Sequence, residues 1–129
     1  LESEALRQSI PLLEATDIAL ARSYIEQLEN QTGHAEIGRL NRLLHMSLYC
    51  KAHNQKLLRL IDSELNEEER FLRFHLSAMG LGKLTQDDHN ALVDAASDKR
   101  VDDAVEILAE HLNKGARTIR RYLDAQQSS

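Results

Sequence analysis

Apolar side chains recur every three or four residues along nearly the whole chain, as in Ile37, Leu40, Leu44 and Leu48. This spacing is typical of the buried face of an amphipathic α-helix. Pro11 ends the first such segment, because its ring disfavours helical geometry in the residue before it. We therefore expect helices over approximately residues 1–10, 16–30, 37–53, 55–79, 85–97 and 102–123.

The segments between these stripes contain residues that commonly begin or end a helix. Gly80 to Gly82 would end the fourth helix, and Thr85 offers an N-cap for the fifth. Composition agrees, since the chain has 1 Pro, 5 Gly, 3 Tyr and 2 Phe and is rich in strong helix formers. We see no internal repeat or linker. Residues 1–129 are expected to form one all-α domain, an antiparallel bundle of about six helices.

Charge and cysteine content narrow the function classes. The 16 basic and 21 acidic residues give a formal net charge of −5, which argues against direct binding of nucleic acid. A single cysteine, Cys50, cannot form an internal disulfide, and no apolar run reaches the roughly 18 residues of a membrane span. We therefore expect a cytoplasmic protein without a membrane segment. Leu1 lies inside a helical pattern, so we expect a piece of a longer protein.

Six histidines in an acidic chain with few aromatics are its distinctive chemical feature. His45 is interleaved with the apolar stripe of the third expected helix, and Asn41 lies one turn before it on the same face. His89 stands three and four residues before two apolar positions, and His111 follows two others at the same spacing. Three helices are therefore expected to direct an imidazole into the interior of the bundle.

Two interpretations of these inward histidines stay open. A single buried imidazole is commonly a core residue whose ring nitrogens are satisfied by hydrogen bonds. Three imidazoles can instead share one metal ion, because neutral imidazole nitrogen is a preferred ligand of zinc, nickel, copper and iron. Helix bundles also collect metal ligands from facing helices. We expect such a site to bind zinc or nickel in preference to magnesium, because most of its ligands are nitrogens.

Four short motifs occur in order along the chain: Asn41-Arg-Leu-Leu-His45, Ala52-His-Asn54, Asp88-His89 continuing to Ala95, and Ala104 continuing to His111-Leu112. Over nearly the whole chain they resemble the C-terminal effector-binding domain, of FCD type, of the FadR subfamily of GntR transcriptional regulators, in its metal-dependent branch. The resemblance implies that a metal is bound by Asn41, His45, His89 and His111. It further implies a small carboxylate metabolite as effector, a DNA-binding domain missing upstream of this chain, and a homodimer.

One position departs from the family's pattern. An aspartate of the family is replaced by Asn41, so a charged carboxylate becomes a neutral amide, the poorer ligand of a transition metal. The metal could then bind more weakly, Asn41 could contact the effector instead, or the site could have lost its metal.

Three further residues are candidates for the effector site. Arg73 could form a bidentate pair with a carboxylate, since its helix should line the interior of the bundle. His75 is expected on an inward face, as a core or pocket-lining residue. Asn54 is a third candidate, although a helix cap is its simplest role.

Catalytic interpretations find less support. The sequence has no glycine-rich phosphate loop, no His-Glu-x-x-His pair and no serine elbow. Three histidines with an open position could activate water, but no inward Glu or Asp stands out as a general base. We expect a metal- and effector-binding domain and not an enzyme. The alternatives are a metal-dependent hydrolase and a metal-free helical interaction or dimerisation module.

Overall fold

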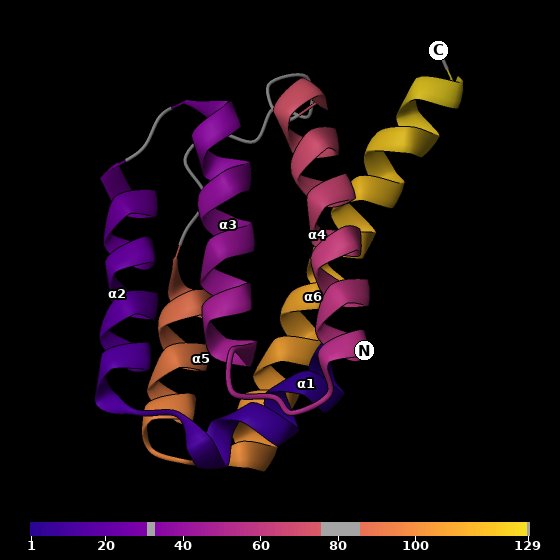
Figure 1. Cartoon of the computed structure of the whole chain (residues 1–129). Helices are drawn as coiled ribbons and strands as arrows, with labels where there is room; N and C mark the ends of the chain where they lie inside the picture. Colours follow the sequence, from indigo (N-terminus) through magenta and orange to yellow (C-terminus); the bar gives the residue numbers. More distant parts are fainter. Residues whose placement is uncertain (31–32, 76–85, 129) are drawn as a thin grey trace.

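The computed structural model describes residues 1–30, 33–75 and 86–128, and within these ranges it contains helices and no strand (Figure 1). Six α-helices and one short 3-10 helix follow one another as α1 (Glu2–Ser9), η1 (Ile10–Leu12), α2 (Ala15–Asn30), α3 (His34–Tyr49), α4 (Gln55–His75), α5 (Asp87–Ser97) and α6 (Val101–Ser128). The all-α prediction is confirmed. The expected Thr85 cap and the glycines of 80–82 lie outside the described residues.

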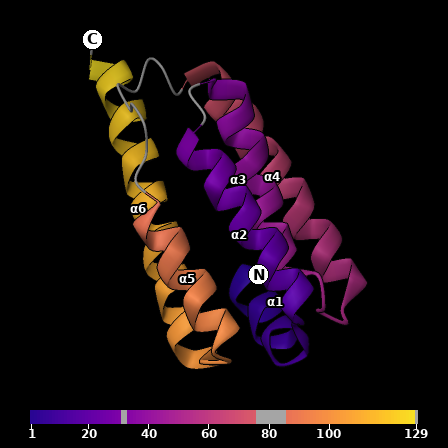
Figure 2. The same ribbon diagram turned by 90° about the vertical axis from the view of Figure 1, so that its left-hand side faces the viewer.

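The helices form two groups that α1 joins at one end. In the first group α3 packs between α2 and α4, and in the second α5 packs along α6. Figure 2 shows α5 and α6 on one side of the molecule and α2, α3 and α4 on the other. α1 lies across one end of the bundle and contacts α3, α4 and α6, while α2 contacts α5. Helices of both groups therefore face a shared interior.

Contacts between α1 and the segment after α3 decide where α3 ends. The sequence predicted a helix to about residue 53, but α3 ends at Tyr49. The amide of Lys51 donates to Ser9 Oγ at 3.1 Å, and the amide of Asn54 donates to Gln8 Oε1 at 3.3 Å. These amides are satisfied by side chains of α1, far away in sequence, so the chain leaves the helix early and turns towards α4.

The beginning of α4 and the turn from α5 to α6 are held by specific hydrogen bonds. Asn54 Oδ1 accepts the amide of Leu57 at 3.0 Å, which makes Asn54 the N-cap of α4. Lys99, with φ of 60°, follows α5 in the left-handed conformation that commonly ends a helix. The Lys99 ammonium donates to the carbonyls of Ile10 and Leu13, which ties this turn to η1.

The core is formed by the apolar stripes that the sequence predicted. Its largest fully buried aliphatic side chains come from α1, η1, α3, α4, α5 and α6: Leu6, Ile10, Leu40, Leu44, Leu48, Ile61, Leu92, Val93 and Leu108. Gly38 allows α3 and α4 to approach closely, because a Cβ there would lie 3.2 Å from the carbonyl oxygen of Glu69. None of the described helices is long and apolar enough to cross a membrane.

Candidate metal centre

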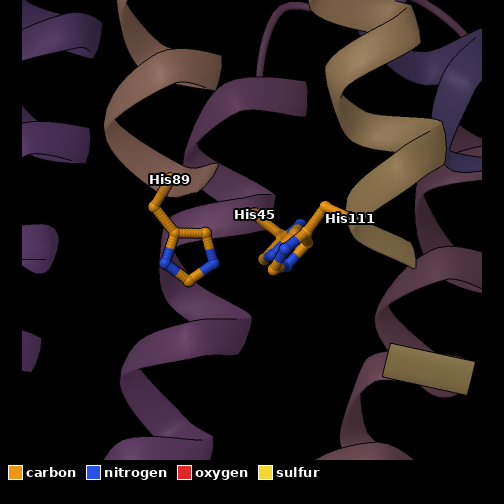
Figure 3. A group of neighbouring side chains, drawn as sticks. All are labelled: His45, His89 and His111. Atoms are coloured by element: carbon orange, nitrogen blue, oxygen red, sulfur yellow. The ribbon is translucent and has the colours of Figure 1, made fainter. Parts of the chain in front are cut away.

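Three histidines from three helices meet in the interior of the bundle. His45 comes from α3, His89 from α5 and His111 from α6, and their rings point towards one another (Figure 3). One ring nitrogen of each lies within 4.8 Å of the corresponding nitrogens of the other two. The ring centroids of His89 and His111 are 4.8 Å apart, and each lies 5.5 Å from that of His45. The structure therefore brings together the three residues that the helical spacing had singled out.

Helix packing explains why the three imidazoles lie so close. His45 shares its face of α3 with Leu44 and Leu48, and it is 2% exposed. His89 lies in the first turn of α5 and is 7% exposed, whereas the His111 side chain is 25% exposed. The group is thus buried on the α3 side and opens towards the middle of α6.

The Nδ1 atom of His45 faces a hydroxyl and a carboxylate. Tyr49 Oη lies 3.3 Å from this nitrogen, and Tyr49 in turn donates its hydroxyl hydrogen to Glu2 Oε1 at 2.7 Å. The same Glu2 oxygen is 3.6 Å from His45 Nδ1. With its hydrogen on Nδ1, His45 presents the lone pair of Nε2 to the centre of the cluster.

The ring of His89 is held by Gln86, just before α5. His89 Nδ1 lies 2.7 Å from Gln86 Oε1 and donates to it, so Nε2 carries the lone pair. His89 Nε2 is the one buried side-chain nitrogen or oxygen of the described residues that has no hydrogen-bond partner. Burial, assisted by the nearby His45 and His111, lowers the pKa of His89 to about 2. His89 is therefore neutral, with a free lone pair aimed into the cluster.

His111 is oriented by an acidic residue of α5. Its Nδ1 lies 3.2 Å from Asp88 Oδ2, and Lys114 approaches the same carboxylate at 3.5 Å. Burial and the proximity of His45 lower the pKa of His111, although Asp88 acts in the opposite direction. His111 is thus also favoured in the neutral form that binds metals.

Two glutamates make the α1 and α4 side of the cluster acidic. Burial alone would raise the pKa of Glu2, but the hydrogen-bonding and electrostatic interactions with His45, together with the hydrogen bond from the Tyr49 hydroxyl, lower it. Burial raises the pKa of Glu68, with Glu2 adding to the shift and His45 opposing it. Glu2 is therefore the carboxylate on this side that stays ionised.

The donor set fits a transition metal. Each histidine has an oxygen acceptor for Nδ1 on a different residue, which is the outer layer that orients metal-bound imidazoles in proteins. Neutral imidazole nitrogen suits zinc, nickel, copper or iron, whereas magnesium prefers oxygen ligands. The unpartnered Nε2 of His89 is the atom that a metal would satisfy.

The other predicted site residues lie in different surroundings. Asn41 is half-buried on α3, one turn before His45, and its role as a ligand stays a prediction. Asn54 is exposed and caps α4, so the cap interpretation is confirmed, while a contact with an effector stays a prediction. Arg73 and His75 belong to the last turn of α4, but their side chains lie outside the described residues.

The partners of the three imidazoles were not identified from the sequence. Tyr49 follows His45 by four residues, and Gln86 precedes His89 by three, so helical spacing could have indicated both. Asp88 directly precedes His89 in the sequence, yet its carboxylate lies beside His111 of another helix. Glu2 could not have been found in this way, because only the packing of α1 on α3 brings it to Tyr49.

The chain is similar to two solved structures of regulators. A GntR family transcriptional regulator from Pseudomonas syringae pv. tomato str. DC3000 matches with a TM-score of 0.96 and 59% sequence identity, over 98% of this chain and 54% of that one. The E. coli protein McbR/YncC shares the fold, with a TM-score of 0.78 and 19% identity, over 94% of this chain and 63% of that one. The chain therefore spans less than two thirds of either structure. No curated protein matches it.

The family model described as the FCD domain matches residues 1–114, which include all three histidines and the residues that hold their Nδ1 atoms. This match agrees with the order of motifs along the chain and with the six-helix fold. The chain belongs to the FCD domain family.

Proposed function

We propose that this domain binds one divalent transition metal ion through His45, His89 and His111. The observation that supports this proposal is the hydrogen bonding of the ring nitrogens. All three Nδ1 atoms have oxygen partners, whereas the buried Nε2 of His89 has none. Leaving a buried polar atom unpaired costs about 1–3 kcal/mol, so its presence calls for a partner that the described part of the chain does not supply. A metal ion is such a partner.

Zinc or nickel is the metal that we propose. Three neutral nitrogens favour these borderline ions over magnesium or calcium. Asn41 could add an amide oxygen from the turn of α3 before His45, or leave that position to water. When bound, the ion would act as a Lewis acid that attracts an anionic group of a small molecule.

A small organic acid is the effector that we propose. Its carboxylate would bind at the metal, with Arg73, His75 and Asn54 as candidates for further contacts. The open pocket of about 400 Å³ between α5 and α6 suits an acid less well, because its charged side chains are Arg100 and four carboxylates: Asp88, Asp103, Glu106 and Glu110. An anion would be repelled there and attracted by the metal.

The proposed output is control of DNA binding by another domain of the same protein. The similar chain from P. syringae is a GntR family transcriptional regulator, and this chain spans about half of it. The net charge of −5 does not suit direct contact with DNA, so a separate domain would bind the operator. We propose that the full protein is a cytoplasmic homodimer and that metal and effector bias its DNA affinity.

Metal content of the purified, untagged chain tests the proposal. We expect about one zinc or nickel ion per chain by elemental analysis, and loss of most of it in His45→Ala, His89→Ala and His111→Ala. His53→Ala is the matched control, because His53 is exposed and lies on the turn before α4. Full metal content in a chain that lacks two of the three histidines would contradict the shared site.

Turnover distinguishes the proposed sensor from a metal-dependent hydrolase. A thermal-shift screen of organic acids, with and without chelator, should find acids that stabilise only the metal-loaded chain. The acid that binds, and its ester, should be recovered unchanged after prolonged incubation. Metal-dependent conversion of either would favour the hydrolase instead.

A further inference from the structure

We propose that Glu2 is a positioning residue for the metal centre, which acts through His45 and supplies the negative charge that the ligands themselves lack. This inference rests on the proposed metal binding. Three neutral imidazoles and the amide of Asn41 carry no charge, so a divalent ion bound by them would keep its full positive charge in a largely buried site. Charge of that kind is stable only near a compensating anion.

Glu2 is the carboxylate best placed to compensate it. Its oxygen lies 3.6 Å from His45 Nδ1 and accepts the Tyr49 hydroxyl at 2.7 Å, and the Glu2 side chain is 13% exposed. No lysine or arginine of the described residues forms an ion pair with it. Asp88, the carboxylate beside His111, is 37% exposed and is shared with Lys114. Solvent and the Lys114 ammonium therefore weaken the field of Asp88 more than that of Glu2.

The arrangement also fixes the direction in which His45 binds. His45 Nδ1–H is bonded to the Tyr49 hydroxyl, which donates to the Glu2 carboxylate, and such a chain ending in a carboxylate raises the basicity of the opposite ring nitrogen and holds the ring at one angle. Tyr49 is fully buried and stands four residues after His45 on α3, so it holds the Glu2 carboxylate in place. Because Glu2 belongs to α1, this contact couples the position of α1 to the metal centre.

Substitution of Glu2 tests the inference through metal affinity. Competition titration of zinc against a chromophoric chelator should show that Glu2→Gln binds about 10- to 100-fold more weakly than the wild-type chain. Glu4→Gln is the matched control, because Glu4 is an exposed glutamate of the same helix that is bonded only locally by Gln8. It should bind zinc as the wild type does. The visible spectrum of bound cobalt should shift in Glu2→Gln and stay unchanged in Glu4→Gln.

The stability of the metal-free proteins separates this role from a structural one. Glu2→Gln should unfold in urea at nearly the same denaturant concentration as the wild type when both are metal-free. If Glu2→Gln fails to fold, Tyr49→Phe takes its place and should also weaken zinc binding, because it removes the hydroxyl that holds Glu2. Wild-type zinc affinity in either folded variant would overturn the inference and leave the histidine site standing. A wild-type chain that binds neither zinc nor nickel would overturn both proposals.

Discussion

A buried histidine whose Nε2 lacks a partner should destabilise the metal-free protein, and replacing it should remove that cost. His89→Leu deletes the unpaired Nε2, which is worth roughly 1–3 kcal/mol, and loses the hydrogen bond to Gln86, worth about 1 kcal/mol. The side chains are of similar size, so no large cavity forms. At neutral pH we therefore expect the free energy of unfolding to stay within about 1 kcal/mol of the wild type or to rise slightly.

The effect should become large on acidification. The pKa of His89 falls from an ordinary 6.5 to about 2 on folding, so between these values the unfolded chain binds a proton that the native chain does not. Stability is therefore lost as the pH falls below about 6.5, by up to about 1.4 kcal/mol per pH unit. Between about pH 7 and about pH 5, His89 alone should lower the free energy of unfolding by about 2 kcal/mol. The His89→Leu variant should lack this contribution.

Urea unfolding of chelator-treated protein, followed by circular dichroism of the helices, measures the free energy of unfolding at neutral pH and its loss on acidification. The change in the free energy of unfolding between the two pH values is measured for the wild type and for His89→Leu. Subtracting one change from the other separates the contribution of His89 from that of the other titrating groups. His53→Leu is the control, because it removes an exposed histidine outside the cluster and should keep the wild-type pH dependence. If His89→Leu lost as much stability on acidification as the wild type, His89 would not be buried in its neutral form.

Two further predictions concern Asn41 and the glycines. Asn41→Asp adds a negative charge one turn before His45 and should raise zinc affinity in a competition titration; unchanged affinity would show that Asn41 is not a ligand. Gly115→Ala should raise the free energy of unfolding in urea by up to about 1 kcal/mol, because a Cβ there meets nothing within 4 Å and alanine favours the helix. Gly38→Ala should gain less or lose, because its Cβ would press on Glu69 at 3.2 Å, and an equal gain at both positions would contradict the close approach of α3 and α4.

The helices could be predicted from the sequence because their signals are local. The stripe through Leu40, Leu44 and Leu48 is buried as expected, and Asn54 caps α4 from the position next to its first residue. The end of α3 could not be predicted, because it depends on bonds from the backbone near Lys51 to side chains of α1. Hydrophobic spacing contains no information about such distant partners.

The three histidines were predictable for the same reason, and their surroundings were not. The face of a helix on which a residue lies follows from its spacing to apolar neighbours, and this placed His45, His89 and His111 in the interior. Which helices touch is a property of the whole fold, so the distances between the rings had to come from the structure. The Glu2 to Tyr49 contact spans 47 positions and has no signature in either local segment.

The geometry of the rings argues against the interpretation that these histidines are merely packed. A core histidine chosen for packing would be expected to satisfy both nitrogens, since an unpaired one opposes folding. Here each ring has an oxygen partner at Nδ1, while burial and the neighbouring rings lower the pKa values of His89 and His111, and the buried Nε2 of His89 has no partner among the described residues. The unpaired nitrogen of His89 should make the metal-free domain less stable than one in which that nitrogen has a partner. A metal bound as we propose would pair this nitrogen and, because its three ligands lie on different helices, would couple metal occupancy to the relative positions of α3, α5 and α6.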